Sequence, residues 1–243
     1  MMIANEEFKI LTEQSKEWEI KYEFSNIQSH SSIRMVDTLY PNSITEHEFF
    51  IIHDLIIKNN LKYGYEVATG FGISALAGAL AFKQTGGKLV TMDSYYEEKI
   101  QDPLKDHQNS IFVESNGFKS VNQLIDKYKL NDILYPTIGY SPDDTNKCIN
   151  DIFDENIKLN YIFIDGLHTP EAALNDFKVI ENKIDIDNFV VIFHDGDGIL
   201  GAINYAENYL NCKAECVSNP PHGFYMYVLQ NCNKEKINLT KEI

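Results

Sequence analysis

The 243-residue sequence has few cysteines, no long apolar run and no excess of basic residues. Its four cysteines are scattered, which argues against a disulfide framework and favours a reducing compartment. No apolar stretch reaches membrane-spanning length, and the first residues, MMIANEEFKI, have no signal-peptide pattern. We therefore expect a cytoplasmic protein with no membrane partner.

Acidic residues outnumber basic ones, with 36 Asp and Glu against 21 Lys and Arg, and the net charge is −15. Such a surface would repel the phosphates of nucleic acids, so nucleic acid is not an expected partner. The charge says little about a small-molecule substrate. The length suffices for one α/β domain with a full core, and no linker interrupts it.

Two parts of this single compact domain differ in pattern. Residues 1–60 are polar and helical in pattern and predict a cap; their apolar stretch at Phe49–Ile57 would pair subunits if it were exposed. Residues 61–243 alternate strand and helix patterns, which predicts a parallel sheet with helices on both faces. The expected strands are Tyr65–Thr69, Lys88–Asp93, Ile133–Ile138, Tyr161–Asp165 and Phe189–His194, and the expected helices are Ile73–Lys83, Val121–Lys129, Asp144–Glu155, Pro170–Asn182 and Gly198–Tyr209.

The C-terminal part has a different pattern. KAECVSNPPHGFYMYVLQ (Lys213–Gln230) contains two strand-like runs joined by a Pro-Pro-His-Gly turn, with no helix between them. This predicts an antiparallel hairpin at the end of the parallel sheet.

The most informative segment is YEVATGFGIS (Tyr65–Ser74), followed by KLVTMDS (Lys88–Ser94). It predicts a strand, a glycine turn, a helix and a second strand with Asp93 at its tip. Gly70 and Gly72 let the backbone approach a ligand, and the following helix directs its unpaired amides to the same place. Asp93 is placed to accept hydrogen bonds from ribose hydroxyls, so an adenosine-containing cofactor is predicted.

Two cofactors fit this segment. Gly70–Ala75 matches GxGxxA, with Asp93 about 20 residues on, as in a dinucleotide-binding fold. Glu66, four residues before Gly70, suits a cationic ligand better than a pyrophosphate. The expected terminal hairpin also differs from a dinucleotide fold, which would continue with strand–helix units.

The segment resembles motif I, (E/D)xGxGxG, of class I S-adenosylmethionine-dependent methyltransferases, with Ala68 at the first glycine. The resemblance implies a Rossmann-like class I sheet, a Glu66 that helps to hold the methionine amine, and a Gly-x-Ser segment that borders the adenine. The predicted cofactor-binding residues are Glu66, Ala68, Gly70, Gly72, Ser74, Asp93, Ser94, Ser141 and Asp165.

Two further strand ends carry polar residues. Asp165 ends one expected strand, with His168 three residues later, and His194 and Asp195 end the next. Because ligands of open α/β sheets bind at the carboxyl ends of the strands, these side chains should meet beside the cofactor. The oxygens of Asp165 and Asp195 suit Mg²⁺, which would bind and orient a substrate hydroxyl. His168 is then placed to take the proton.

These strand ends, D-G-x-H-T and (I/V)-x-H-D, look like those of metal-dependent sugar and macrolide O-methyltransferases. The resemblance implies that Asp165 and Asp195 are metal ligands and that His168 is the general base. Asp197 is a candidate third ligand, and the resemblance assigns His194 no role. The catalytic prediction is therefore His168 and Asp165, with Asp165 and Asp195 holding the metal.

Together these patterns predict methyl transfer from S-adenosylmethionine to a hydroxyl of a small, sugar-like acceptor, assisted by Mg²⁺. Three alternatives remain at this point. The acidic rim would also attract a cationic amine, which would make the protein an N-methyltransferase. The GxGxxA match permits an NAD(P)-dependent oxidoreductase. A cofactor-binding protein without catalysis is the third, although the cluster of polar residues at the rim argues against it.

Overall fold

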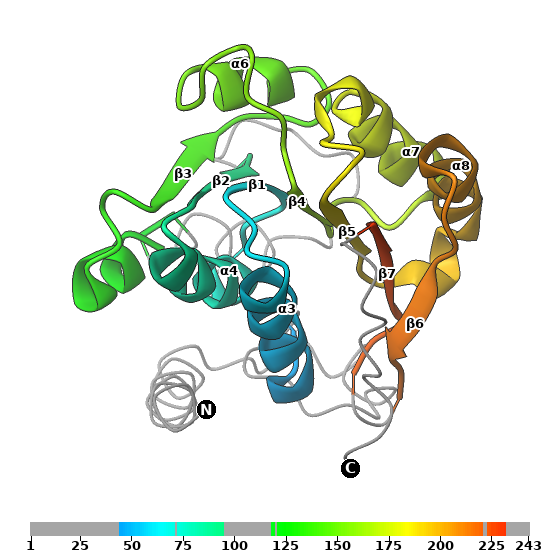
Figure 1. The fold of residues 1–243 in the computed structure, drawn as a ribbon, viewed down its shortest axis with the longest axis horizontal. Coiled ribbons are helices and arrows are strands. Elements are labelled where there is room, and N and C mark those ends of the chain that lie inside the picture. Colours follow the sequence, from blue (N-terminus) through cyan, green and yellow to red (C-terminus); the bar gives the residue numbers. More distant parts are fainter. Residues whose placement is uncertain (1–43, 71, 95–117, 120, 221–222, 232–243) are drawn as a thin grey trace, which may run out of the picture.

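A seven-stranded sheet forms the centre of the molecule (Figure 1). The computed structural model describes residues 44–70, 72–94, 118–119, 121–220 and 223–231. The strand order is β3-β2-β1-β4-β5-β7-β6, and the first five of these are parallel to one another. The strands are β1 (Tyr63–Val67), β2 (Lys88–Asp93), β3 (Leu134–Ile138), β4 (Tyr161–Ile164), β5 (Phe189–Phe193), β6 (Glu215–Ser218) and β7 (Met226–Asn231).

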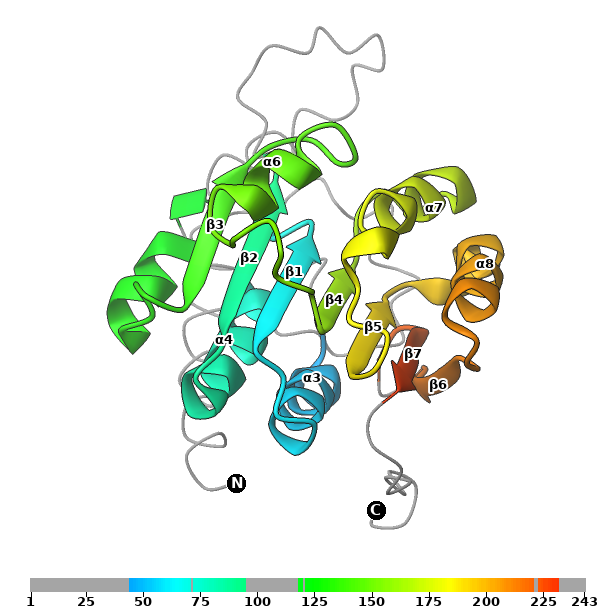
Figure 2. The ribbon, with the colours of Figure 1, turned by 45° about the horizontal axis from the view of Figure 1, so that its top comes forward.

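Helices cover both faces of the sheet (Figure 2). One face packs against α3, α4 and the helical residues 121–128, and the other packs against α6, α7 and α8. No helix in the described ranges is long and apolar enough to cross a membrane. The labelled helices are α3 (Glu46–Lys58), α4 (Ile73–Thr85), α6 (Thr145–Asn150), α7 (Pro170–Lys178) and α8 (Leu200–Leu210), with short 3₁₀ turns η1 (Glu181–Lys183) and η2 (Gly196–Gly198).

The predicted fold is confirmed, and the differences are at element ends. β1 begins two residues earlier than predicted and stops at Val67, because Ala68 adopts a positive φ of 69° that a strand does not allow. The helix predicted over Asp144–Glu155 is limited to α6, and the one predicted over Pro170–Asn182 is divided into α7 and η1.

The terminal hairpin is also confirmed. β7 pairs antiparallel with β5 and with β6, and the β6–β7 register shifts between Cys216 and Ser218. β7 therefore lies between β5 and β6, so the last two strands form a hairpin instead of a further parallel strand–helix unit.

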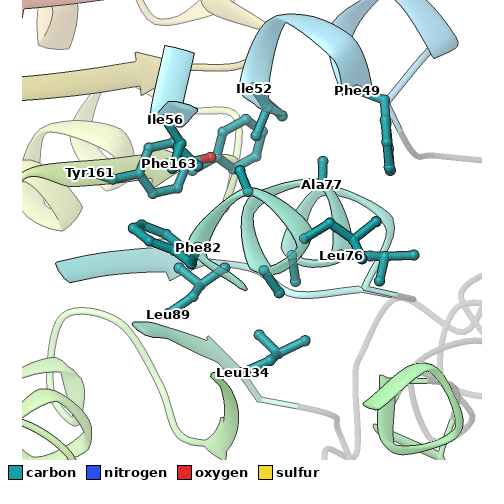
Figure 3. Packing of buried hydrophobic residues seen from close by; sticks show 14 of the residues in the cluster. Phe49, Ile52, Ile56, Leu76, Ala77, Phe82, Leu89, Leu134, Tyr161 and Phe163 are labelled. Atoms are coloured by element: carbon teal, nitrogen blue, oxygen red, sulfur yellow. The ribbon is translucent and has the colours of Figure 1, made fainter. Parts of the chain in front are cut away.

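Helix α3, which precedes β1 in the sequence, belongs to the main core (Figure 3). Its apolar residues pack with α4 and with the sheet, and full burial of each large side chain contributes about 1.5–3 kcal/mol. Most of the apolar stretch is therefore part of this core, with Phe50, Ile51 and Ile57 partly buried, and subunit pairing stays a prediction. Residues 1–43, most of the predicted cap, lie outside the described residues, so the cap and its boundary at residue 60 stay predictions. The apolar core shared by α3, α4 and the sheet includes Phe49, Ile52, Ile56, Leu76, Phe82, Leu89, Tyr161 and Phe163.

Candidate active site

The loop between β1 and α4 has the geometry of a ligand-binding turn. Ala68, Gly70 and Gly72 all have positive φ, at 69°, 51° and 83°. The Gly70 amide donates a hydrogen bond of 2.8 Å to Asp93 Oδ2, which joins the turn to the tip of β2. The structure thus brings the predicted turn and the predicted ribose-binding carboxylate together.

Gly72 has no room for a side chain, because a Cβ there would lie 2.6 Å from Val121 Cγ2. We expect Gly72→Ala to lower the free energy of unfolding by roughly 2 kcal/mol or more, since overpacking adds to the cost of its left-handed conformation. Ala68→Gly is the matched variant: it relieves the same kind of backbone strain and should stabilise by up to about 1 kcal/mol. Urea denaturation measures both. A fully stable Gly72→Ala protein would contradict this account of the turn.

Glu66 lies beneath the turn and is almost completely buried. The Ser74 hydroxyl of α4 donates a hydrogen bond to Glu66 Oε1, whereas Oε2 has no hydrogen-bond partner among the described residues. Burial raises the pKa of Glu66 to about 8, although the Ser74 hydroxyl acts in the opposite direction. Glu66 and Ser74, both predicted to bind the cofactor, therefore form one contact under the turn.

The raised pKa predicts a stability that depends on pH. Between the ordinary value of 4.5 and about 8, the unfolded chain is ionised at Glu66 while the folded chain keeps the proton, so raising the pH favours unfolding. Glu66→Gln replaces this titrating carboxyl group by an amide that stays neutral at every pH in this range. Its stability relative to the parent should therefore rise between pH 5 and 8, by at most about 1.4 kcal/mol per pH unit. Urea denaturation at both pH values tests this, and an unchanged difference would refute it.

Ser141 and Ser94, two further predicted cofactor-binding residues, have other side-chain partners than Glu66 and Ser74. The Ser141 hydroxyl donates a 2.5 Å hydrogen bond to Asp176 of α7, a buried carboxyl whose pKa burial raises. The side chain of Ser141 is thus bonded to α7, and its place beside an adenine stays a prediction. Ser94 Oγ lies 3.5 Å from Asp93 Oδ1, beside the predicted ribose site.

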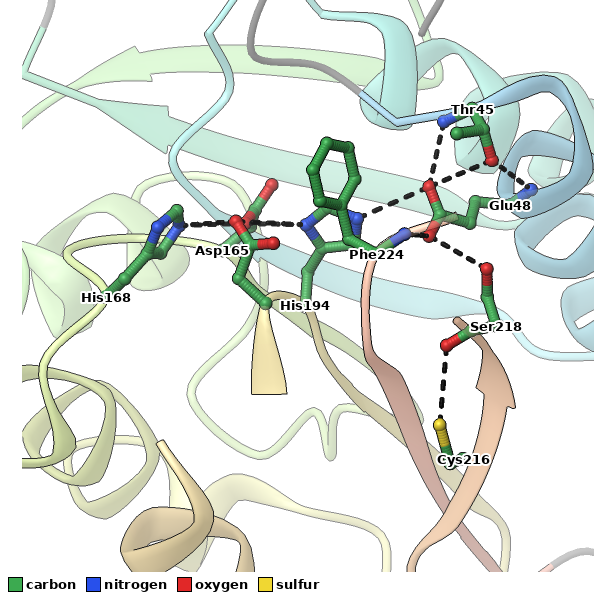
Figure 4. A network of polar contacts seen from close by, with 9 residues as sticks. Thr45, Glu48, Asp165, His168, His194, Cys216, Ser218 and Phe224 are labelled. Carbon is green, nitrogen blue, oxygen red and sulfur yellow. Dashed lines mark hydrogen bonds and ion pairs between the residues drawn. The ribbon is translucent and has the colours of Figure 1, made fainter. Parts of the chain in front are cut away.

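The carboxyl ends of β4 and β5 carry the predicted catalytic cluster (Figure 4). His168 Nε2 lies 3.3 Å from Asp165 Oδ1 and 3.2 Å from Asp195 Oδ2. His194 Nδ1 lies 3.0 Å from the same Asp165 oxygen and 3.9 Å from Asp195 Oδ2. The structure therefore brings all four residues together, with Asp165 between the two imidazoles.

A fifth residue, Glu48 of α3, extends the cluster and was missed by sequence reasoning. Its carboxylate is fully buried, with Oε2 3.4 Å from His194 Nε2. The Thr45-x-x-Glu48 spacing is a capping-box signature that the sequence does contain, and the structure forms this box at the start of α3. The box alone does not indicate a contact with β5.

The ionisable groups of the cluster shift one another's pKa. Burial opposes ionisation of Asp165, yet His194 and His168 together lower its pKa to about 2. The hydrogen bond to Asp165 raises the pKa of His168. Burial disfavours a charged His194, but Asp165 and Glu48 outweigh it and raise the pKa of His194 well above its ordinary value. Burial raises the pKa of Asp195.

The donor set fits a divalent cation. One ligand atom each from Asp165, His194 and Asp195 lies within 4.8 Å of the others. The two predicted metal ligands are thus adjacent. Asp197, the candidate third ligand, is not part of this group, and His194 takes its place among the described residues.

Comparison with known proteins identifies the class. Residues 66–196, more than half of the chain, match a family described as a methyltransferase domain. The chain therefore belongs to this family, and the predicted class I methyltransferase is confirmed. The dinucleotide-dependent alternative is not supported. A search of curated proteins finds no match.

Solved structures share the fold at low sequence identity. An O-methyltransferase from Bacillus cereus in complex with SAH superposes with a TM-score of 0.58 and 13% identity, over 92% of this chain and 99% of that one. The O-methyltransferase TomG from Streptomyces achromogenes, in complex with SAM, has a TM-score of 0.57 and 12% identity, over 78% and 82%. CalS11, a TDP-rhamnose 3′-O-methyltransferase of calicheamicin biosynthesis, has a TM-score of 0.56 and 10% identity, over 91% and 93%.

Proposed function

We propose that this methyltransferase moves the methyl group of S-adenosylmethionine to a hydroxyl of a small, sugar-like molecule. The observation that carries the proposal is the position of Asp165 between His168 and His194. This cluster stands at the end of β4, next to the turn that follows β1. A proton acceptor would thus lie beside the cofactor's methyl group.

The turn and the tip of β2 would hold the adenosyl part of the cofactor. Gly70 lets the backbone approach, since a Cβ at this position would contact none of the described residues. The N-terminus of α4 directs its first amides to the same place. Asp93 would bind the ribose, and the Ser141 backbone would border the adenine.

His168 is the proposed general base. Its side chain is half-exposed, so an acceptor can reach the imidazole. Nε2 faces Asp165 and Asp195, so Nδ1 is the nitrogen proposed to take the proton. The sulfonium already activates the methyl group, so the protein has to orient the hydroxyl and remove its proton. Asp165, ionised at neutral pH, stabilises the positive charge that His168 then carries.

A divalent cation held by Asp165 and Asp195 is part of this proposal. When bound, it would lower the pKa of the acceptor hydroxyl. The fit rests on the two carboxylates and on the nitrogen of His194.

The sugar-like acceptor is supported by the D-G-x-H-T and (I/V)-x-H-D strand ends, and by the shared fold of an enzyme whose substrate is TDP-rhamnose. A cytoplasmic location is also proposed, in keeping with the free thiols of Cys148, Cys212 and Cys216.

Calorimetric titration with S-adenosylmethionine, S-adenosylhomocysteine and NADH, each with Mg²⁺ and with EDTA, tests the cofactor. We expect binding of both adenosyl compounds and none of NADH; the reverse result would refute the proposal. Release of S-adenosylhomocysteine with nucleotide sugars, glycosides and amines then tests the acceptor. Turnover with amines alone would refute hydroxyl methylation.

A further inference from the structure

Glu48 is a buried anion held by three separate segments. Its Oε2 accepts hydrogen bonds from the Thr45 amide (2.8 Å) and the Thr45 hydroxyl (3.1 Å). Its Oε1 accepts from the Ser218 hydroxyl of β6 (3.0 Å) and from the Phe224 amide before β7 (2.7 Å). Gly223 packs so closely that a Cβ there would lie 2.3 Å from Glu48 Oε1. The carboxylate is therefore fixed in position.

The ring of His194 is fixed by this carboxylate and by two aromatic rings. Its Nε2 faces Glu48 and has no other partner among the described residues. The rings of Phe163 and Phe224 lie 5.9 Å and 5.3 Å from it, centre to centre. The opposite nitrogen, Nδ1, consequently points at Asp165 and Asp195. A carboxylate on one ring nitrogen is the usual arrangement when a metal binds the other.

We propose that Glu48 is a positioning residue that presents His194 Nδ1 as the third protein ligand of a divalent cation bound by Asp165 and Asp195. The cation would displace to solvent the proton that Nδ1 shares with Asp165. This inference rests on the proposed metal site. Around an ion with bonds of about 2.1 Å, neighbouring ligand atoms lie about 3.0 Å apart in an octahedron and about 3.4 Å apart in a tetrahedron. The contact of His194 Nδ1 with Asp165, at 3.0 Å, has the octahedral value, and its contact with Asp195, at 3.9 Å, is longer.

An imidazole ligand also changes the choice of metal. Carboxylates and water suit Mg²⁺, whereas imidazole suits first-row transition metals. The affinity of a mixed nitrogen and oxygen site rises from Mn²⁺ through Co²⁺ to Ni²⁺. The site should therefore bind Co²⁺ and Ni²⁺ more tightly than Mg²⁺. An all-oxygen site would show a smaller preference.

The first test measures metal binding without any acceptor. Calorimetric titration with Mn²⁺ compares the parent protein with Glu48→Gln, and with Glu46→Gln as an exposed control on the same helix. We expect Glu48→Gln to weaken Mn²⁺ binding by about 10–100-fold and the control to have no effect. S-adenosylhomocysteine affinity reports whether each variant is folded. Equal Mn²⁺ affinity in a folded Glu48→Gln protein would overturn the role of Glu48.

Glu48→Gln places an amide where four donors point, and the variant is liable to unfold. If Glu48→Gln does not fold, Ser218→Ala replaces it in the titration, because this change removes one hydrogen-bond donor to Glu48 and keeps the negative charge of Glu48. Several-fold weaker Mn²⁺ binding is expected; unchanged binding would overturn the proposal.

The second test detects the ligand atom directly. His168→Gln removes the other imidazole from the cluster, so pulsed electron paramagnetic resonance of its Mn²⁺ complex should still show coupling to one histidine nitrogen. Absence of this coupling, or absence of Mn²⁺ binding by the parent protein, would overturn the inference. Methyl transfer that persists in EDTA would then show that the proposed function stands without a metal.

Discussion

Replacing His168 by alanine is expected to lower the turnover of methyl transfer by roughly 100-fold or more. His168 Nε2 lies near both Asp165 and Asp195, and its half-exposed side chain is open to an acceptor. Loss of the imidazole removes the proton acceptor, while the residues proposed to hold the cofactor stay in place. Initial rates of S-adenosylhomocysteine formation measure the effect, with the acceptor that the screen identifies.

Two measurements separate this role from a structural one. The S-adenosylhomocysteine affinity of His168→Ala should stay close to that of the parent, and added imidazole should restore part of the turnover. His53→Ala, which removes an imidazole of α3 that contacts Gln84 and not the cluster, is the control. Unchanged turnover in His168→Ala would remove this residue from the mechanism.

The catalytic rim could be predicted because its geometry follows from the strand pattern. Once β4 and β5 are neighbouring parallel strands, their carboxyl ends must adjoin. Asp165 and Asp195 are therefore brought together by topology, and His168 is three residues beyond one of them. The pairing of β1 with β2 likewise brings Gly70 next to Asp93. The catalytic and metal-binding roles of Asp165, His168 and Asp195 stay predictions.

The contacts of Glu48 could not be predicted in this way. Glu48 meets Ser218 and Phe224 across sequence separations of 170 and 176 residues. Such contacts depend on how α3 packs against the terminal hairpin, and no local pattern determines that packing. The direction of Ser141 towards Asp176 has the same origin, since α7 supplies the partner. In both cases the sequence indicates the element, and tertiary packing decides the partner.

The second large effect concerns the cofactor. Asp93→Ala should weaken S-adenosylhomocysteine binding by about 100-fold or more, since hydrogen bonds to a charged group contribute about 1.5–3 kcal/mol each. The substitution removes the acceptor that holds the Gly70 amide at 2.8 Å, and with it the proposed ribose contact. The turn and the ligand are therefore affected together. Calorimetric titration of the purified variant measures the loss.

Asp93→Asn separates these two contributions. Its amide oxygen can still accept the Gly70 N–H, but its NH₂ group cannot accept from a ribose hydroxyl. An intermediate affinity is expected if Asp93 contacts the ribose. Asp187→Ala, an exposed carboxylate just before β5, controls for the loss of negative charge and should bind like the parent. Parent-like affinity in Asp93→Ala would show that the cofactor does not depend on this carboxylate, and the proposed ribose site would have to move away from the tip of β2.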